Sequence, residues 1–323
     1  MTTVPDKVAE GVGSWLQRSM PLVALMLLVL LFSLLSPRFL SIDNLANIAV
    51  QSSHIGLIAI GMTLVIATGG IDLSVGSVLA LSICVAGLAM APADAGGAGL
   101  SHVTGWCIGL ATGALAGAVN GWLISGLGLS PFIATLGMMS IARGVANVLT
   151  DGMPVEDLPE AALALGSSSI AGMPWSVLLW AGIATLGGLV LGWTRLGRYA
   201  CAMGSNEEAL RLSGVRIGPW KTALYVLSGL LSAAAGLIFL GRVSNAQPSA
   251  GVGFELDAIA AVVIGGASLM GGRGSMSGTV VGVVLMGVLR NGLVLMDVSA
   301  FWQQLVIGVV VVVAVLLDRW RSA

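Results

Sequence analysis

The sequence predicts an all-α integral membrane protein, and three of its features lead to this fold class. Of its 323 residues, 57% are hydrophobic and only 9% are charged, whereas a soluble domain carries about 25% charged residues. The apolar residues gather in runs of about 20, the length of a helix that crosses a bilayer. Glycine and proline recur inside these runs, as they do in membrane helices. We therefore expect a single transmembrane domain over 20–318, between a cytoplasmic N-terminal segment, 1–19, and a cytoplasmic tail, 319–323.

About ten apolar runs are candidate spans. The first follows Lys7 and Arg18 and looks like a secretory signal, but no A-x-A-like cleavage site comes after it, so we predict an uncleaved span. The eighth has only about 14 residues and is expected to form a short, broken or re-entrant helix. The runs cover 20–36, 45–67, 74–91, 104–125, 130–149, 174–193, 222–241, 257–270, 277–296 and 301–317.

The distribution of basic residues predicts that both termini are cytoplasmic, because positive charge is retained on the inner side of a membrane. With ten spans, Arg38 and Arg242 fall outside. The loop over 151–174 carries four carboxylates and no cation, so it also belongs outside, and its "EDLPEAALAL" segment is expected to form a short surface helix. The basic residues expected inside are Lys7, Arg18, Arg195, Arg198, Arg211, Arg216, Lys221, Arg273, Arg319 and Arg321.

The fourth span contains a glycine at every fourth position. The series is Gly105, Gly109, Gly113, Gly117 and Gly121. Residues at this spacing lie near one face of a helix, and glycine there lets a second backbone approach closely. We predict a packing surface at this stripe and no ligand site.

A carboxylate interrupts the second and third runs in "ATGGIDLSVGSVLALS", residues 67–82. Gly69 and Gly70 permit a break in the helix, and Asp72 or Ser74 is expected to cap the helix that restarts, by accepting its first free N–H groups. A gate, or a contact with coupling machinery, is the alternative role. "GGIDLSVGSV" and the later "GGRGSMSGTV" share G-G-x5-G-[ST]-V, which leaves a parallel internal duplication open.

The long cytoplasmic loop, 194–221, reads "TRLGRYACAMGSNEEALRLSGVRIGPWK". Ser205 or Asn206 supplies an N-cap, and Glu207 and Glu208 then fall in the first turn, where the helix dipole favours negative charge. Gly214 is a typical residue at a helix end. A helix held off the membrane in this way can dock into a groove of a soluble partner. The plainer alternative is a solvated loop helix.

Glu208-Ala209 followed by Gly214 resembles the E-A-A-x-x-x-G signature of bacterial ABC importer permeases, with Leu210 in place of the second alanine. The stretches "IAIGMTLVIATGGIDLSVGSVLALS" and "QPSAGVGFELDAIAAVVIGGASLMGGRGSMSGT" resemble the permeases of ribose-type sugar importers more specifically. The resemblance implies an ABC importer permease architecture in a bacterial inner membrane. It also implies a second permease copy, a cytoplasmic ATPase subunit and a periplasmic sugar-binding protein. Coupling to the ATPase would fall to Ser205, Asn206, Glu207, Glu208, Ala209, Arg211 and Gly214.

Several other functions find no support in the sequence. The Walker A lysine is absent, since Gly272 and Arg273 follow Gly266-x4-Gly271, so any ATP hydrolysis belongs to a partner. The net charge of −1 gives no footprint for nucleic acid. Three unevenly spaced cysteines without a CxxC pair are expected to be apolar fillers, and we predict no metal, cofactor or catalytic residue.

Polar side chains at membrane depth are costly, and each is a candidate for a transport pathway or gate. The alternative is that they tie helices together or anchor them at the interface. Arg290 in the ninth span is a further polar residue of this kind. The candidates are Asp72, Ser74, Asn120, Arg143, Asn147, Glu255, Asp257, Asn291, Trp302 and Gln303.

Two classes of function fit these observations. The first is the permease subunit of an ATP-driven importer that passes ribose or a related monosaccharide, which the resemblance and the loop helix favour. The second is a secondary transporter or channel for a small polar solute, with Asp72, Glu255 and Asp257 as ion carriers. A membrane enzyme lacks the clustered ligands that a metal site needs. We adopt the first.

Overall fold

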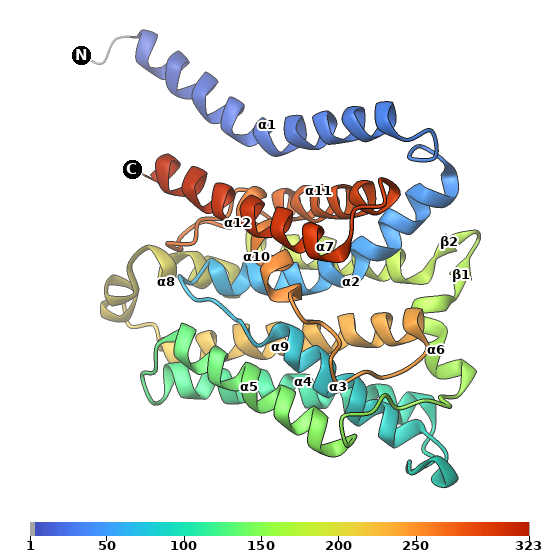
Figure 1. Ribbon diagram of the computed structural model, residues 1–323. Coiled ribbons are helices and arrows are strands. Elements are labelled where there is room, and N and C mark those ends of the chain that lie inside the picture. Colours follow the sequence, from blue (N-terminus) through green and yellow to red (C-terminus); the bar gives the residue numbers. More distant parts are fainter. Residues whose placement is uncertain (1–3, 323) are drawn as a thin grey trace.

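The computed structural model describes the backbone of residues 4–322 and the side chains of 20–316. Over this part of the chain the polypeptide forms a bundle of twelve α-helices (Figure 1), which confirms the all-helical prediction. The helices are α1 Val4–Leu35, α2 Ile42–Ile66, α3 Val75–Met90, α4 His102–Ser125, α5 Pro131–Leu149, α6 Glu160–Ser167, α7 Trp175–Trp193, α8 Arg195–Leu212, α9 Ile217–Val243, α10 Phe254–Ile264, α11 Met276–Leu295 and α12 Ala300–Ser322. A 3-10 turn, Ala93–Ala95, and a hairpin of β1, Ser169–Ile170, with β2, Met173–Pro174, complete the secondary structure.

Each of the ten predicted spans coincides with a helix, but the helices differ in length. Six described helices are long and apolar enough to cross a membrane: α2, α4, α5, α7, α9 and α11. The apolar segments Met20–Leu35, Val75–Met90 and Ala300–Leu316 are shorter. With 11 residues, α10 is about 16 Å long, roughly half the thickness of the hydrocarbon core. The short eighth helix was expected, and the total of ten crossings stays a prediction.

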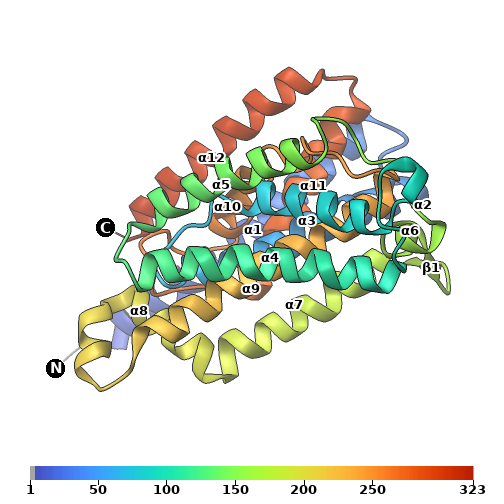
Figure 2. The ribbon, with the colours of Figure 1, turned by 90° about the horizontal axis from the view of Figure 1, so that it is seen from below.

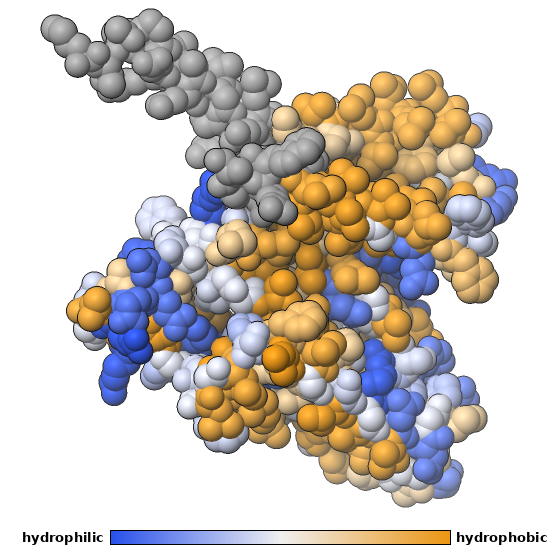
Figure 3. Space-filling model, turned by 60° about the vertical axis from the view of Figure 1, so that its left-hand side comes forward, coloured by the Kyte–Doolittle hydropathy of each residue, from blue (hydrophilic) through white to orange (hydrophobic). Residues whose placement is uncertain are grey.

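The bundle has two distinct ends. The start of α1, the end of α12 and helix α8 lie at one end, while α6 and the β-hairpin lie at the other (Figure 1). Hydrophilic residues gather mainly near these two ends, with apolar residues between them (Figure 3). The side chains of Lys7, Arg18, Arg319 and Arg321, used above to predict orientation, lie outside the described residues.

Helices α4 and α9 form the closest helix pair and run side by side across the molecule (Figure 2). A Cβ atom added at Gly113 would lie 2.3 Å from the carbonyl oxygen of Gly229, and one at Gly117 would lie 2.2 Å from that of Tyr225. At the start of the stripe, Gly105 meets Met90 of α3 instead. The predicted packing surface is confirmed, and it serves two neighbouring helices because the stripe drifts around α4.

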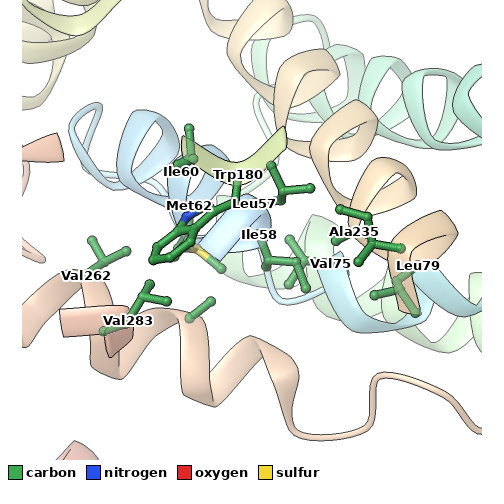
Figure 4. Close-up of a cluster of buried hydrophobic side chains, with 14 of the residues drawn as sticks. Leu57, Ile58, Ile60, Met62, Val75, Leu79, Trp180, Ala235, Val262 and Val283 are labelled. Carbon is green, nitrogen blue, oxygen red and sulfur yellow. The ribbon is translucent and has the colours of Figure 1, made fainter. Parts of the chain in front are cut away.

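Helix α2 lies at the centre of the fold, where residues 56–68 are all buried. It contacts α7, α9, α10 and α11. Trp180 of α7 lies over Leu57 and Ile60 (Figure 4), and a Cβ atom at Gly56 would lie 2.1 Å from its indole nitrogen. Because Gly56 has no Cβ atom, the tryptophan ring can lie against the α2 backbone.

Two connections interrupt apolar runs. Break 1, residues 67–74, separates α2 from α3, and break 2, residues 265–275, separates α10 from α11. The first confirms the interruption that Gly69 and Gly70 predict. Ser74 occupies the N-cap position of α3 with φ −82° and ψ −10° and makes no side-chain cap hydrogen bond. Ser74 therefore does not cap α3, because its backbone is already helical and its hydroxyl donates to Asp72. Oδ1 of Asp72 accepts from the Ser74 N–H at 3.1 Å, so of the two candidates it is Asp72 that satisfies a free N–H group at the start of the helix.

The segment 194–221 is largely helical, which corrects the prediction of a loop with one short helix. Helix α8 begins at Arg195, and α9 begins at Ile217, five residues before the predicted run. Hydropathy missed α8 because only Gly197, Ala200 and Met203 are buried in it, spaced three residues apart on a mostly polar helix. At the other end, the predicted surface helix in "EDLPEAALAL" is confirmed as α6.

We predict that Gly113→Val lowers the thermal stability of the purified protein, because the side chain would enter the α9 backbone. Overpacking of this kind costs about 1–3 kcal/mol or more. Gly137→Val on α5 is the matched control, since nothing lies within 4 Å of a Cβ at that glycine. Melting of the two variants in detergent, followed by tryptophan fluorescence, makes the comparison. Equal melting temperatures would contradict the close α4–α9 contact.

Candidate functional site

A cavity of about 450 Å³ lies between α2, α9, α10 and α11. Its volume is in the range of about 300–1,000 Å³ that small-molecule sites occupy. The C-terminal end of α9 and the first turn of α10 contribute to it, so it lies away from the α8 end of the bundle. The polar residues of the lining are Gln51, Ser52, His54, Arg242, Gln247, Ser249, Asp257, Arg290 and Gln303.

An ion pair between Asp257 and Arg290 joins two walls of this cavity. Oδ2 of Asp257 accepts from Nη2 of Arg290 at 2.6 Å. The aspartate side chain is 4% exposed and the arginine side chain 40%. The second carboxylate oxygen, Oδ1, is buried without a hydrogen-bond partner. A buried charge must be paired to be tolerated, and here the exposed part of the Arg290 guanidinium keeps further N–H donors for a polar solute.

Three rings form an apolar corner beside these charges. The centroid of His54 lies 5.5 Å from that of Phe239 and 5.4 Å from that of Phe254, and the two phenyl rings are 5.7 Å apart. His54 is 4% exposed. The cavity therefore presents hydrogen-bonding groups and flat apolar faces together, which suits a neutral solute with both hydroxyl and C–H surfaces.

Asp72 is the centre of a second polar cluster, in break 1. Its Oδ1 accepts from the Ser74 N–H at 3.1 Å and from the Ser74 hydroxyl at 2.6 Å, and its Oδ2 accepts from the Ser228 hydroxyl at 2.8 Å. Asn120 donates to Ser74 Oγ at 3.0 Å. The cluster ties α3, α4 and α9 together. No ion pair among the described residues includes Asp72.

Helix α8 has two parts, because the backbone at Asn206 is not helical (φ −160°, ψ 95°). Oδ1 of Asn206 accepts from the Ala209 N–H at 2.9 Å and so caps the second part. Ser205 instead donates to the Cys201 carbonyl at 3.0 Å. Of the two caps the sequence allowed, Asn206 is the one used, and Gly214 at φ +83° follows the helix end as predicted.

The charged residues of this second part are exposed. Glu208 pairs with Arg211 within the helix, and Glu207 pairs with Lys221 of α9 at 2.6 Å. The exposed pair within the helix is of the kind that contributes little to stability, whereas Lys221 is largely buried in the second pair. The surface they form, residues 206–212, is therefore free to serve contact with another protein.

The remaining predicted residues are dispersed over the bundle. Of all of them, Asp257 and Gln303 line the cavity. Arg143 donates to the carbonyls of Pro248 and Ala250 at 2.5 and 2.7 Å, so it ties α5 to the segment before α10. Asn291 pairs with Asn44 through two 2.9 Å bonds. Glu255 accepts a hydrogen bond from the Gly253 N–H. The other two residues are exposed: Asn147, and Trp302 at 63%.

Most residues of the cavity lie outside the predicted set. Gln51 and His54 stand three residues apart on α2, a spacing that places them on one face, and two polar groups on one face of an apolar span are a usable signal. Phe239 and Arg242 have the same spacing on α9. That these two faces meet was not predictable from local sequence.

A helical bundle with interrupted membrane helices and a polar cavity between them is the arrangement of a membrane transport protein. Residues 44–315 match the model of the family described as branched-chain amino acid transport system / permease component. The chain belongs to this family of permease components.

Relatives with curated descriptions match nearly the whole chain. The ribose import permease protein of Escherichia coli strain K12 is 45% identical over 313 residues, 96% of each chain. The ribose import permease protein of Bacillus subtilis is 44% identical and covers 95% of this chain and 94% of its own. The L-arabinose transport system permease protein of E. coli is 36% identical over 95% of this chain and 92% of its own. No solved structure gives a significant match.

We predict that Asp72→Asn retains folding and assembly with a modest loss of transport, whereas Asp72→Leu lowers both. Asparagine keeps an oxygen for Ser74, and the Ser228 hydroxyl is able to accept from its amide. Leucine leaves the Ser228 hydroxyl buried without a partner, and leaves the Ser74 N–H and hydroxyl without an acceptor although Asn120 still donates to Ser74 Oγ; each unsatisfied group costs about 1–3 kcal/mol. Size-exclusion profiles and uptake measure the two effects. Equal and severe loss of transport in both variants, with assembly intact, would show that the charge itself is used.

Proposed function

We propose that this chain is the permease subunit of an ATP-driven ABC importer and passes ribose or a related monosaccharide into the cytoplasm. The observation that carries the proposal is the near full-length similarity to ribose import permeases. The arabinose permease in the same group supports a pentose-sized solute. A periplasmic sugar-binding protein would deliver the sugar, and selection among sugars would rest largely with that protein.

The cavity beside Asp257 and Arg290 is the proposed path for the sugar. Its ring corner and its amide, hydroxyl and guanidinium groups match the two kinds of surface that a monosaccharide presents. Asp257, the one carboxylate of the lining, is bound to the Arg290 guanidinium, and the other charged residue of the lining is a cation, Arg242. That pairing favours a neutral solute over an ion-coupled mechanism in which Asp257 carries a cation.

In the proposed arrangement the chain crosses a bacterial inner membrane about ten times, with both termini cytoplasmic, and pairs with a second permease copy. The position of α8 at the same end of the bundle as the start of α1 and the end of α12 supports the shared side of the termini (Figure 1). The apolar surface between the two hydrophilic ends supports the lipid contact (Figure 3).

The exposed part of α8 is the proposed contact with a cytoplasmic ABC ATPase subunit. It is capped, charged and turned away from the bundle, which suits a helix that docks into a groove of a soluble partner. The contact would involve Ser205, Asn206, Glu207, Glu208, Ala209, Arg211 and Gly214.

Reconstitution tests this function directly. We expect the chain to co-purify with the ATPase subunit from its own genome, and the pair in liposomes to import labelled ribose or another pentose when ATP and the sugar-binding protein are supplied. Uptake that proceeds without ATP and collapses when an ion gradient is dissipated would overturn the proposal in favour of a secondary transporter.

The proposed path makes a second prediction at Gln51, which lines the cavity. Gln51→Leu keeps the volume but removes a hydrogen bond to the sugar. A hydrogen bond of this kind contributes about 0.5–1.5 kcal/mol, so we expect the uptake rate to fall about two- to tenfold with assembly unchanged. Thr185→Val on the exposed face of α7 is the control. Wild-type uptake by Gln51→Leu would place the sugar path elsewhere.

A further inference from the structure

Helix α8 meets both breaks of the membrane helices at one residue, Gly204. A Cβ atom added there would lie 2.2 Å from the carbonyl oxygen of Ala67, in break 1, and 2.2 Å from the amide nitrogen of Gly272, in break 2. Contacts this short do not occur for real Cβ atoms, so any side chain at this position must displace the backbone of a break. Three segments far apart in the sequence thus touch through their backbones.

The two breaks are also bonded to each other. The Gly272 N–H donates to the Ala67 carbonyl at 3.0 Å. Gly69, Gly271 and Gly272 have φ values of +77°, +85° and +79°, a conformation that other residues adopt only with strain. A Cβ atom at Gly271 would lie 2.7 Å from the Gly69 amide nitrogen. We call Ala67, Gly69, Gly204, Gly271 and Gly272 the glycine junction.

The junction stands directly before the break in α8. Ser205 follows Gly204, and its hydroxyl lies 2.5 Å from where a Cβ of Gly272 would be. Asn206 then ends the first part of α8 and caps the exposed second part. A displacement of the exposed part would therefore act on the backbone at Ser205 and Gly204. This backbone is in contact with both breaks.

Each break leads to a region already described. Break 1 continues into the Asp72 cluster and α3. Break 2 joins α10, which carries Phe254 and Asp257, to α11, which carries Arg290, so both partners of the cavity ion pair stand on helices that end at this break. Thr63 of α2 and Thr279 of α11, bonded at 2.7 Å, hold the two helices together beside the junction.

We infer that the glycine junction is the joint that transmits movement of the exposed part of α8 to α3, α10 and α11 at once. This inference rests on the proposed function, because it assigns the coupling step of that importer to these residues. Gly204 is a positioning residue in this account: it touches neither sugar nor nucleotide. The rival account is a static brace, which stabilises the fold and transmits nothing.

Gly204→Ala, in the complete importer in liposomes, separates the two accounts. Gly192→Ala on α7 is the control, because nothing lies within 4 Å of a Cβ at that glycine. Sugar imported per ATP hydrolysed is the readout, with the amount of co-purified ATPase as the measure of assembly. We expect Gly204→Ala to assemble and hydrolyse ATP while sugar imported per ATP falls by about tenfold, a coupling loss typical of linked sites.

Wild-type sugar per ATP in Gly204→Ala would overturn the inference, as would a loss confined to assembly with normal sugar per ATP in what assembles. If Gly204→Ala does not accumulate, Gly69→Ala tests the same joint with a smaller disturbance. The nearest atom to the new Cβ would be 3.6 Å away, so the free-energy cost of this variant comes from the positive φ of Gly69. The same loss of coupling is expected there, and its absence contradicts the joint. Failure of the proposed function is distinct from both results, because the wild-type complex would then not import with ATP.

Discussion

The constraint on which this structure depends is that a helix interrupted inside a membrane domain must satisfy its free backbone groups with protein, because lipid offers no hydrogen bonds. Break 1 and break 2 satisfy part of this need in each other, through the bond from the Gly272 N–H to the Ala67 carbonyl. The bond requires the two breaks to lie in contact, and the contact requires glycine. Helix α8 shares that contact through Gly204.

The rest of the arrangement follows from where the breaks stand. Helix α2 ends next to the junction, α11 begins after break 2, and the two are hydrogen-bonded through Thr63 and Thr279. Farther from the junction, both helices line the cavity together with α9 and α10. The cavity lies on parts of α2 and α11 away from the junction, and the surface that we assign to the ATPase lies on α8, next to the junction. The two regions are thus connected through α2, α10 and α11, each of which has one end at a break.

Hydropathy was sufficient to predict the fold class, the ten helical segments and the short α10, since these depend on local runs of residues. Gly69 and Gly70 correctly indicated break 1, whereas the shared pattern at Gly271 only left an internal duplication open. That the two breaks touch depends on residues about 200 positions apart, which no local pattern encodes. The first part of α8 and the role of His54 were missed for a related reason: the first part of α8 is too polar for a hydropathy run, and His54 lines the cavity together with Phe239 and Phe254, which are distant in the sequence.

The most direct test of this account is hydrogen exchange in the complete transporter in lipid nanodiscs, measured with and without trapped nucleotide. The account predicts that peptides covering residues 66–75 and 265–276 change their exchange together with the exposed part of α8 when nucleotide is trapped. A change in the α8 peptide alone, with both breaks exchanging as before, would contradict it, because the movement would then reach the membrane helices by another route.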